Sequence, residues 1–264
     1  MERIDVRRLL LAGASGAIIG TLGGLIGLGG AEFRLPVLLG PFKFRALEAV
    51  ILNKAMSLIV VAAALPFRAV AVPVSAVLGS WGAVLNLLAG SLIGAWLGAG
   101  WATRVSSRTL YRTIAVMLVF VGLVLLLGHG GQPSTPPLAG PALVAAGIAA
   151  GLGIGVVAAV MGVAGGELLI PTFVLLFGAD IKLAGSLSLA VSLPTMLVGF
   201  ARYSRDNSFG VLGRNKAFAL VMAAGSIAGA FLGSRLVSLA PSHVLVPLLA
   251  IILFISAWKV WKHE

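Results

Sequence analysis

The sequence GLGGAEFRLP at residues 27–36 returns in altered form as GVAGGELLIP at residues 162–171. The two copies are 135 residues apart, and the same shift matches other parts of the chain without a gap. The matched pairs include Gly16 with Gly151, Gly20 with Gly155, Glu32 with Glu167, and SLIGAWLGA at 91–99 with SIAGAFLGS at 226–234. One unit of about half the chain has therefore been duplicated. Internal duplication in an apolar chain is typical of secondary transporters, in which each half contributes to a central site.

The composition indicates a chain whose solvent is lipid. Hydrophobic residues make up 59% of the chain and charged residues 10%, and the mean hydropathy is +1.10. Several apolar runs approach or exceed the ~20 residues that a helix needs to span a bilayer. We therefore predict an all-α polytopic membrane protein. The first run is expected to be a retained helix, because no small-residue cleavage site follows it. The absence of cysteine excludes disulfides and thiol chemistry.

The apolar runs divide into ten segments, five in each half. They are expected at 9–29, 31–42, 46–66, 79–102 and 109–128 in the first half, and at 142–164, 166–177, 182–201, 215–236 and 243–261 in the second. The domains are a first transmembrane repeat at 1–128, a Gly- and Pro-rich linker at 129–141 and a second repeat at 142–264, which together form one membrane domain. The second segment of each half is short, and at about 1.5 Å per residue it covers only part of a core ~30 Å thick.

Whether these short segments cross the membrane determines how the two halves are related. Crossing gives each half an odd number of spans and inverted repeats, whereas re-entry gives four spans and parallel repeats. The positive-inside rule favours crossing, because with a cytoplasmic N-terminus most cations then lie in the cytoplasm. These cytoplasmic cations are Arg3, Arg7, Arg8, Lys43, Arg45, Arg104, Arg108, Arg112, Arg202, Arg205, Arg214, Lys216, Lys259 and Lys262. Outside lie Arg68, Lys182 and Arg235. We predict inverted repeats in the cell membrane with both termini cytoplasmic.

The repeated glycine turn predicts an anion site. Glycines interrupt the first long segment of each half, and a short helix follows. Such a break exposes backbone N–H groups at the start of the new helix, where the helix dipole is positive and anions bind. We expect the N–H groups of Gly29, Gly30, Gly165 and Gly166 to face a common substrate site near the midplane. The alternative is that these glycines only allow close helix packing.

With these residues, the chain resembles the TauE/SafE sulfite exporter family of membrane proteins. The doubled pattern is Gly-x-Gly-Gly-Gly-x-x-x-x-Pro, in which Ala31 and Ala164 each replace one glycine. The resemblance extends over essentially the whole chain. It implies transport of sulfite, organosulfonates or related small anions, and it leaves the exact substrate and the direction of transport open.

Polar side chains at matched positions of the third segments extend the expected substrate site. Asn53 and Ser57 are one helical turn apart and share a face, and the repeat shift places Ser188 and Ser192 in the same relation. Their amide and hydroxyl groups suit the oxygens of sulfite or a sulfonate. The alternative role of the serines is hydrogen bonding between helices, which is common in membrane bundles.

Two cations are predicted inside the membrane, and the second half repeats neither of them. Lys54 lies nine residues after Arg45, about 13 Å along a helix, and Arg34 lies on the first short helix. Ionisable groups at this depth are functional-site candidates, so we expect both cations to offset the charge of the substrate. Structural pairing with Glu32 or Glu167 is the alternative, and the two roles are compatible.

Glu32 and Glu167 are the acidic residues that lie well inside the predicted core. The helix dipole favours a carboxylate at a helix N-terminus, so a capping role is expected of at least one of them. The further hypothesis is that they couple transport to an ion, either a proton or sodium.

The expected function is secondary transport of a small oxyanion by alternating access around a site between the two repeats. A passive anion channel is one alternative, and a membrane-embedded enzyme acting on a lipid is a weaker one. P-loop, nucleophile-elbow and HExxH motifs are absent, and the three histidines lack metal-ligand spacing. The net charge of +11 is spread between apolar runs rather than along one stripe with aromatic residues. We therefore expect no enzyme activity, cofactor, metal or nucleic-acid partner. Whether the protein is a monomer or a homodimer stays open.

Overall fold

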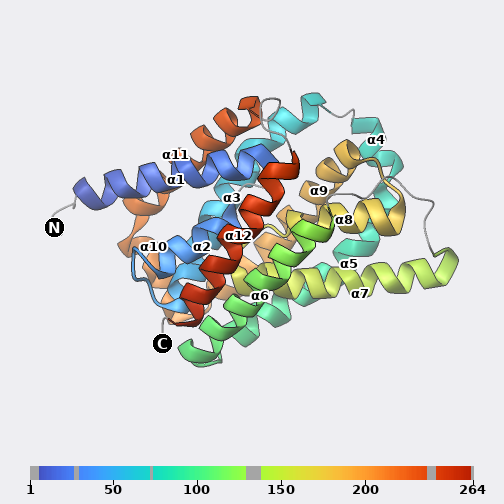
Figure 1. Ribbon diagram of the computed structural model, residues 1–264. Helices are drawn as coiled ribbons and strands as arrows, with labels where there is room; N and C mark the ends of the chain where they lie inside the picture. Colours follow the sequence, from blue (N-terminus) through green and yellow to red (C-terminus); the bar gives the residue numbers. More distant parts are fainter. Residues whose placement is uncertain (1–5, 27–29, 72–73, 129–137, 237–241, 263–264) are drawn as a thin grey trace.

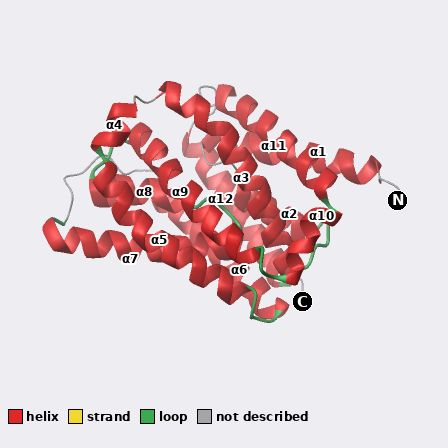
Figure 2. Ribbon diagram, turned by 180° about the vertical axis from the view of Figure 1, so that it is seen from behind, coloured by secondary structure: helices red, strands yellow, loops and turns green. Residues whose placement is uncertain are grey.

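The computed structural model describes residues 6–26, 30–71, 74–128, 138–236 and 242–262, and within these ranges the regular structure is helical (Figure 1, Figure 2). The first half contains α1 (Val6–Ile26), α2 (Ala31–Leu39), α3 (Ala46–Ala71), α4 (Val74–Gly79), α5 (Trp81–Ala102) and α6 (Ser107–Gly128). The second half contains α7 (Gly140–Met161), α8 (Gly166–Phe177), α9 (Ile181–Tyr203), η1 (Asn207–Gly210), α10 (Val211–Arg214), α11 (Lys216–Leu236) and α12 (Ser242–Trp261). The predicted all-α fold class is confirmed.

Seven helices in the described ranges are long and apolar enough to cross a membrane. These spans are Val6–Gly24, Ala46–Ala64, Trp81–Ala102, Ser107–Val124, Gly140–Met161, Lys182–Tyr203 and Lys216–Arg235. Gly166–Phe177 and Ala250–Trp261 are shorter apolar helices. Large apolar side chains such as Leu10, Ile18 and Leu232 point outward, with exposed fractions of 69%, 64% and 57%. These features describe a multi-pass membrane protein whose outer side chains contact lipid.

Each of the ten predicted segments is helical over its described part, with differences in extent. Helix α3 continues past Pro66 to Ala71, and a further short helix, α4, precedes α5, which corresponds to the predicted fourth segment. A proline is tolerated inside a membrane helix where neighbouring groups satisfy the freed carbonyl. The short helices η1 and α10 lie between two apolar runs, so the hydropathy pattern does not mark them.

The closest contacts in the molecule join helices of one half to helices of the other. Helix α1 packs along α11, and α5 packs along α7 (Figure 1). A Cβ on Gly16 would collide with the carbonyl oxygen of Met222, and a Cβ on Gly151 would collide with that of Leu87. The repeat shift converts the first contact into the second. Glycine therefore brings helices of opposite halves together in two seams that the repeat shift relates to each other.

The last helices of the two halves, α6 and α12, lie side by side and run in opposite directions (Figure 1). Near the start of α6, the guanidinium of Arg112 lies 5.5 Å from the ring centre of Trp261, at the end of α12. Further along α6, Gly122 lies against Phe254. Equivalent helices that pack antiparallel imply a two-fold axis perpendicular to them. This geometry supports the inverted-repeat hypothesis, while the side of the membrane on which each terminus lies stays a prediction.

Candidate functional site

Glycines with left-handed backbone stand at both predicted turns. Gly30 and Gly165 directly precede α2 and α8 with φ of 70° and 82°, and Gly162 ends α7 with φ of 69°. A residue with a Cβ adopts this conformation only at a cost, which explains glycine at these positions. Both short helices therefore begin at a glycine turn, as the sequence predicts. Gly29 lies outside the described residues.

The turns leave the first N–H groups of α2 and α8 without partners inside the helix. In α2, the N–H of Arg34 donates to the oxygen of Gly30 at 3.1 Å. In α8, the N–H groups of Leu168 and Leu169 bond to the Gly165 oxygen at 3.1 and 2.9 Å. The N-cap residues Gly30 and Gly165 have no side chain with which to cap these termini. The preceding N–H groups are thus available to a ligand at the positive end of each helix dipole.

Arg34 is fully buried, and neutral side chains from α3 and α11 hold its guanidinium. One terminal nitrogen donates to Oδ1 of Asn53 at 3.4 Å and to Oγ of Ser57 at 3.3 Å. The other donates to Oγ of Ser226 at 3.2 Å. Among the described residues, Nε of Arg34 has no hydrogen-bond partner. The cation therefore lies between helices of both halves without a carboxylate bound to it.

Asn53 and Ser57 also tie α3 to the glycine turn of the second half. The amide nitrogen of Asn53 donates to the carbonyl oxygens of Ala31 and Met161, both at 3.0 Å. The hydroxyl of Ser57 donates to the carbonyl oxygen of Gly162 at 3.3 Å. The expected shared face of the two side chains is therefore turned toward the start of α2 and the glycine turn that follows α7. Hydrogen bonding between helices, the alternative role considered for serine, occurs at both positions.

Lys54 is the second buried cation, and backbone carbonyl groups bind it. Its Nζ donates to the oxygen of Ala158 at 2.7 Å and to that of Val163 at 3.1 Å. Ala158 lies in the last turn of α7, where the helix dipole is negative. Within the described ranges, neither Arg34 nor Lys54 forms a salt bridge, so the cations are not held by direct pairing with buried acids.

Glu32 and Glu167 meet where the two short helices begin. They are 1% and 6% exposed, and their carboxyl groups are close enough to interact directly. Both oxygens of Glu32 lack a hydrogen-bond partner in the described part of the chain. Two equivalent positions of the repeat therefore form one buried acidic cluster. No group of three or more metal-ligating side chains gathers among the residues that the structure describes.

The two expected serines of the second half lie beside this network rather than in it. Ser188 and Ser192 are 4% and 1% exposed on α9. The hydroxyl of Ser188 donates to the carbonyl oxygen of Gly185 in its own helix, at 2.9 Å. No hydrogen bond in the described chain joins either serine to Arg34. The second half therefore supplies carbonyl groups, the hydroxyl of Ser226 and an acid, whereas the first half supplies the cations.

Ser226 is a site residue that was not predicted from the sequence. It begins the SIAGAFLGS copy, and its equivalent Ser91 begins SLIGAWLGA. Ser91 is hydrogen-bonded to Thr195 of α9 at 2.7 Å. The sequence signal that could have identified Ser226 is that a serine stands at the same position in both glycine-rich copies.

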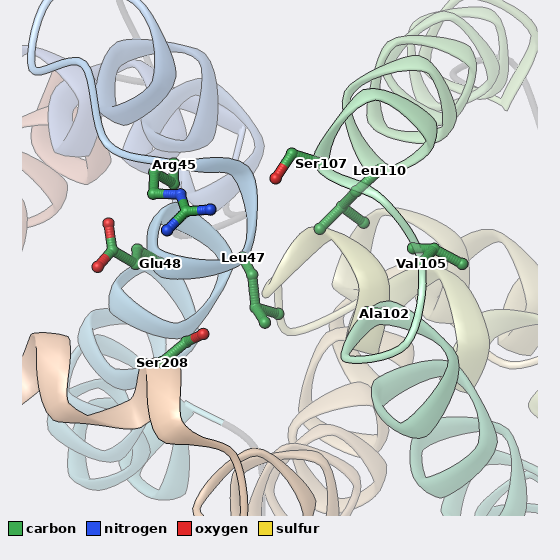
Figure 3. Close-up of a pocket in the computed structure, with 8 residues that line it drawn as sticks. All are labelled: Arg45, Leu47, Glu48, Ala102, Val105, Ser107, Leu110 and Ser208. Atoms are coloured by element: carbon green, nitrogen blue, oxygen red, sulfur yellow. The ribbon is translucent and has the colours of Figure 1, made fainter.

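The candidate site is closed, because Arg34, Asn53 and Lys54 are each 0% exposed. A separate cavity of about 190 Å³ lies where α3 and α6 begin and α5 ends (Figure 3). It is lined by Arg45, Leu47, Glu48, Ala102, Val105, Ser107, Leu110 and Ser208. The guanidinium of Arg45 and the hydroxyl of Ser107 point into it (Figure 3). Arg45 and Lys54 are about 13 Å apart along α3, so this cavity is distinct from the buried site.

Comparisons with known proteins assign the family of the chain. No curated protein and no solved structure matches it. The profile of the sulfite exporter TauE/SafE family matches residues 7–260, which include both glycine turns and the whole candidate site. This match confirms the resemblance seen in the sequence, and the chain belongs to the sulfite exporter TauE/SafE family.

Proposed function

We propose that the protein is a secondary transporter of a small oxyanion, with sulfite or an organosulfonate as its substrate. Membership of a family of sulfite exporters supports transport rather than catalysis. The anion binds between the two halves, and its access alternates between the two sides of the membrane. The protein lies in the cell membrane with both termini in the cytoplasm.

The observation that carries this proposal is the environment of Arg34. Burial of a cation is costly unless an opposite charge or strong hydrogen bonds compensate it. The three acceptors of Arg34 are neutral, and they lie at 3.2–3.4 Å. Charge-assisted hydrogen bonds are shorter, about 2.7–2.9 Å. An oxyanion beside the guanidinium would supply a charged acceptor in direct contact with it and a partner for Nε.

The groups around Arg34 suit a sulfite or sulfonate oxygen. The N-termini of α2 and α8 present backbone N–H groups next to Gly30 and Gly165. The hydroxyl of Ser57 accepts from the guanidinium and donates to Gly162, so it holds Arg34 beside the turn. Lys54 adds positive potential from the neighbouring position on α3. These donors are neutral or cationic, which favours an anionic substrate over a neutral one.

Relative movement of helices has to open the closed site. Glycine contacts bind α1 to α11 and α5 to α7 at backbone distance, so we propose that each pair moves as a stiff unit. Helices α3 and α9 meet between the two pairs. Each moving unit then contains helices from both halves, and the site opens where α3 meets α9.

Thermal unfolding of purified protein tests the ligand class. Sulfite or short alkylsulfonates should stabilise the protein more than carboxylates of similar size. A ligand at 100 times its Kd stabilises by about 2.7 kcal/mol. Arg34→Gln should lose this stabilisation, whereas Arg214→Gln, which breaks an exposed pair with Glu48, is the control and should keep it. Equal stabilisation of Arg34→Gln and the wild-type protein would contradict the proposal.

A counterflow experiment in lipid vesicles separates this function from its alternatives. Unlabelled sulfite inside the vesicles should accelerate uptake of labelled sulfite, because a carrier returns loaded. A passive channel would show flux without this acceleration. An enzyme acting on lipid would form a product and move no anion.

A further inference from the structure

We propose that Glu32 and Glu167 form a proton-binding pair that couples anion binding to proton uptake. The inference rests on the proposed function, because it concerns the same anion site. It selects the proton from the two coupling ions that the sequence leaves open, and it assigns one shared proton site to two residues from different halves.

The first support is the unsatisfied state of Glu32. It is 1% exposed, and neither of its oxygens has a donor among the described residues. An ionised carboxylate buried without hydrogen bonds is costly. A capping carboxylate would instead accept from the free N–H groups of its helix, and no group in the described part of the chain donates to either Glu32 oxygen. Glu32 is therefore placed for a change of protonation rather than for capping.

The second support is the position of Glu167. Its carboxyl group interacts directly with that of Glu32, and it is 6% exposed. Two carboxylates that share a buried site retain a proton more readily than either would alone. One proton between them also gives each group a hydrogen-bond partner, which Glu32 lacks otherwise.

The charged groups around the pair are few and come from identified helices. Arg34 on α2 interacts with Glu32, and Lys54 on α3 interacts with Glu167. Helix α7 contains no titratable residue. The other titratable residues on the helices packed against α2 and α8 lie near the helix ends: Glu48 and Arg68 on α3, Arg7 and Arg8 on α1, Arg108, Tyr111 and Arg112 on α6, Lys182, Arg202 and Tyr203 on α9, and His243 and Lys259 on α12.

The charges of the four central groups explain why a proton and an anion would bind together. With both acids ionised, they cancel the charges of Arg34 and Lys54, and a bound monoanion would leave an excess negative charge. One proton on the acid pair leaves an excess positive charge, which a monoanion then neutralises. Burial makes any uncompensated charge costly, so each ligand favours the binding of the other.

The repeat also places the pair where either side of the membrane can supply the proton. The acids are equivalent under the 135-residue shift, whereas Arg34 and Lys54 correspond to Leu169 and Leu189. Residues related by the pseudo-two-fold axis face opposite openings in an alternating-access cycle. A proton shared between Glu32 and Glu167 is therefore exchangeable through whichever opening is present.

Measurement of proton uptake on binding tests the inference. The probe is ethanesulfonate, because it stays a monoanion across the neutral pH range. Titration calorimetry of the full-length protein in two buffers with different ionisation enthalpies should report about one proton taken up for each anion. The Kd should increase as pH rises, by up to about tenfold for each pH unit. Glu48→Gln, which changes an acid outside the buried site, should behave as the wild-type protein does.

Glu32→Gln and Glu167→Gln should bind the anion with a weaker pH dependence and take up less than one proton. If one variant fails to fold, the other still decides, because each of them removes one member of the pair. Anion binding without proton uptake and with a constant Kd would overturn the inference and leave the proposed function standing. Binding that requires sodium and takes up no proton would overturn it as well. Failure of all sulfonates and sulfite to bind would instead remove the proposed function, and this inference with it.

Discussion

Arg34 and Lys54 are both buried cations, but their partners give them different tasks. Lys54 makes two bonds to carbonyl oxygens at the end of α7, one of them as short as 2.7 Å. Arg34 makes longer bonds to neutral side chains and has an unused nitrogen. Lys54 thus mainly links α3 to the end of α7, whereas Arg34 is the cation that, among the described residues, still has a nitrogen free to bind a ligand.

Lys54→Met should therefore lower stability before it abolishes anion binding. The change leaves the carbonyl oxygens of Ala158 and Val163 without their donor, which costs about 1–3 kcal/mol for each unsatisfied buried group. Thermal unfolding with and without sulfite separates the two effects. A variant as stable as the wild-type protein but without any response to sulfite would make Lys54 a ligand rather than a tie.

Gly165→Ala tests the left-handed turn with the smallest side chain. At a φ of 82°, alanine is strained, and its Cβ would lie 3.3 Å from Ala158 and Ile154. We expect a loss of about 1–3 kcal/mol and weaker sulfite binding, because α8 begins at this turn. Gly30→Val is a less selective test, since its Cβ would also lie 2.6 Å from the oxygen of Ile19.

The matched control for Gly165→Ala is Gly153→Ala on α7, where a Cβ meets nothing within 4 Å. It should be neutral or stabilise the helix by up to about 1 kcal/mol. If Gly165→Ala is as stable as this control and binds sulfite normally, the turn does not depend on its positive φ.

At the scale of helices, glycine seams explain why segments far apart in the chain become neighbours. A Cβ on Gly94 of α5 would collide with the oxygen of Leu152, and a Cβ on Gly229 of α11 would collide with that of Ala17. The repeat shift relates these two contacts. Two parts of the molecule therefore use the same close backbone approach.

Gly94→Ala and Gly229→Ala should destabilise the protein by similar amounts, about 1–3 kcal/mol each, because both force two backbones apart. Their effects should add in the double variant, since the seams are separate. Chemical or thermal unfolding in detergent measures both. Gly82→Ala, near the start of α5 with open space around it, is the control. A large effect of one seam variant and none of the other would show that the seams are not equivalent.

At the scale of the whole molecule, the packing of helices from one half against helices of the other implies that neither half forms a complete wall of the site alone. Arg34 of the first half bonds to Ser226 of the second, and Lys54 bonds to Ala158. The antiparallel packing of α6 and α12 fits halves with opposite orientations in the membrane (Figure 1).

Reporter tags test that orientation. A tag in the linker at 129–141 and a tag after Glu264 should lie on opposite sides of the membrane, with the second in the cytoplasm. The reason is the odd number of segments in each half together with the distribution of cations. Tags on the same side would contradict inverted repeats and support the alternative, in which each half has four spans and the repeats are parallel.

Much of this arrangement could be predicted because it depends on local pattern. Apolar runs mark the helices, and the doubled glycine turn marks both breaks. The depth of Lys54 on α3 is also readable from spacing. The partners of Arg34 and Lys54 were not predictable, because Ser226 reaches Arg34 only through the packing of helices from opposite halves. Backbone carbonyl groups such as that of Ala158 leave no signature in sequence, and the closed state of the site depends on packing throughout the bundle.

The position of a bound anion tests the central claim most directly. Selenite is a heavier analogue of sulfite whose selenium scatters X-rays anomalously, and this chain has no cysteine with which it could react. In crystals grown with selenite, we expect one anomalous peak in contact with the guanidinium of Arg34, between the N-termini of α2 and α8. A peak only in the cavity beside Arg45 would contradict the account, as would no peak under conditions in which sulfite stabilises the protein.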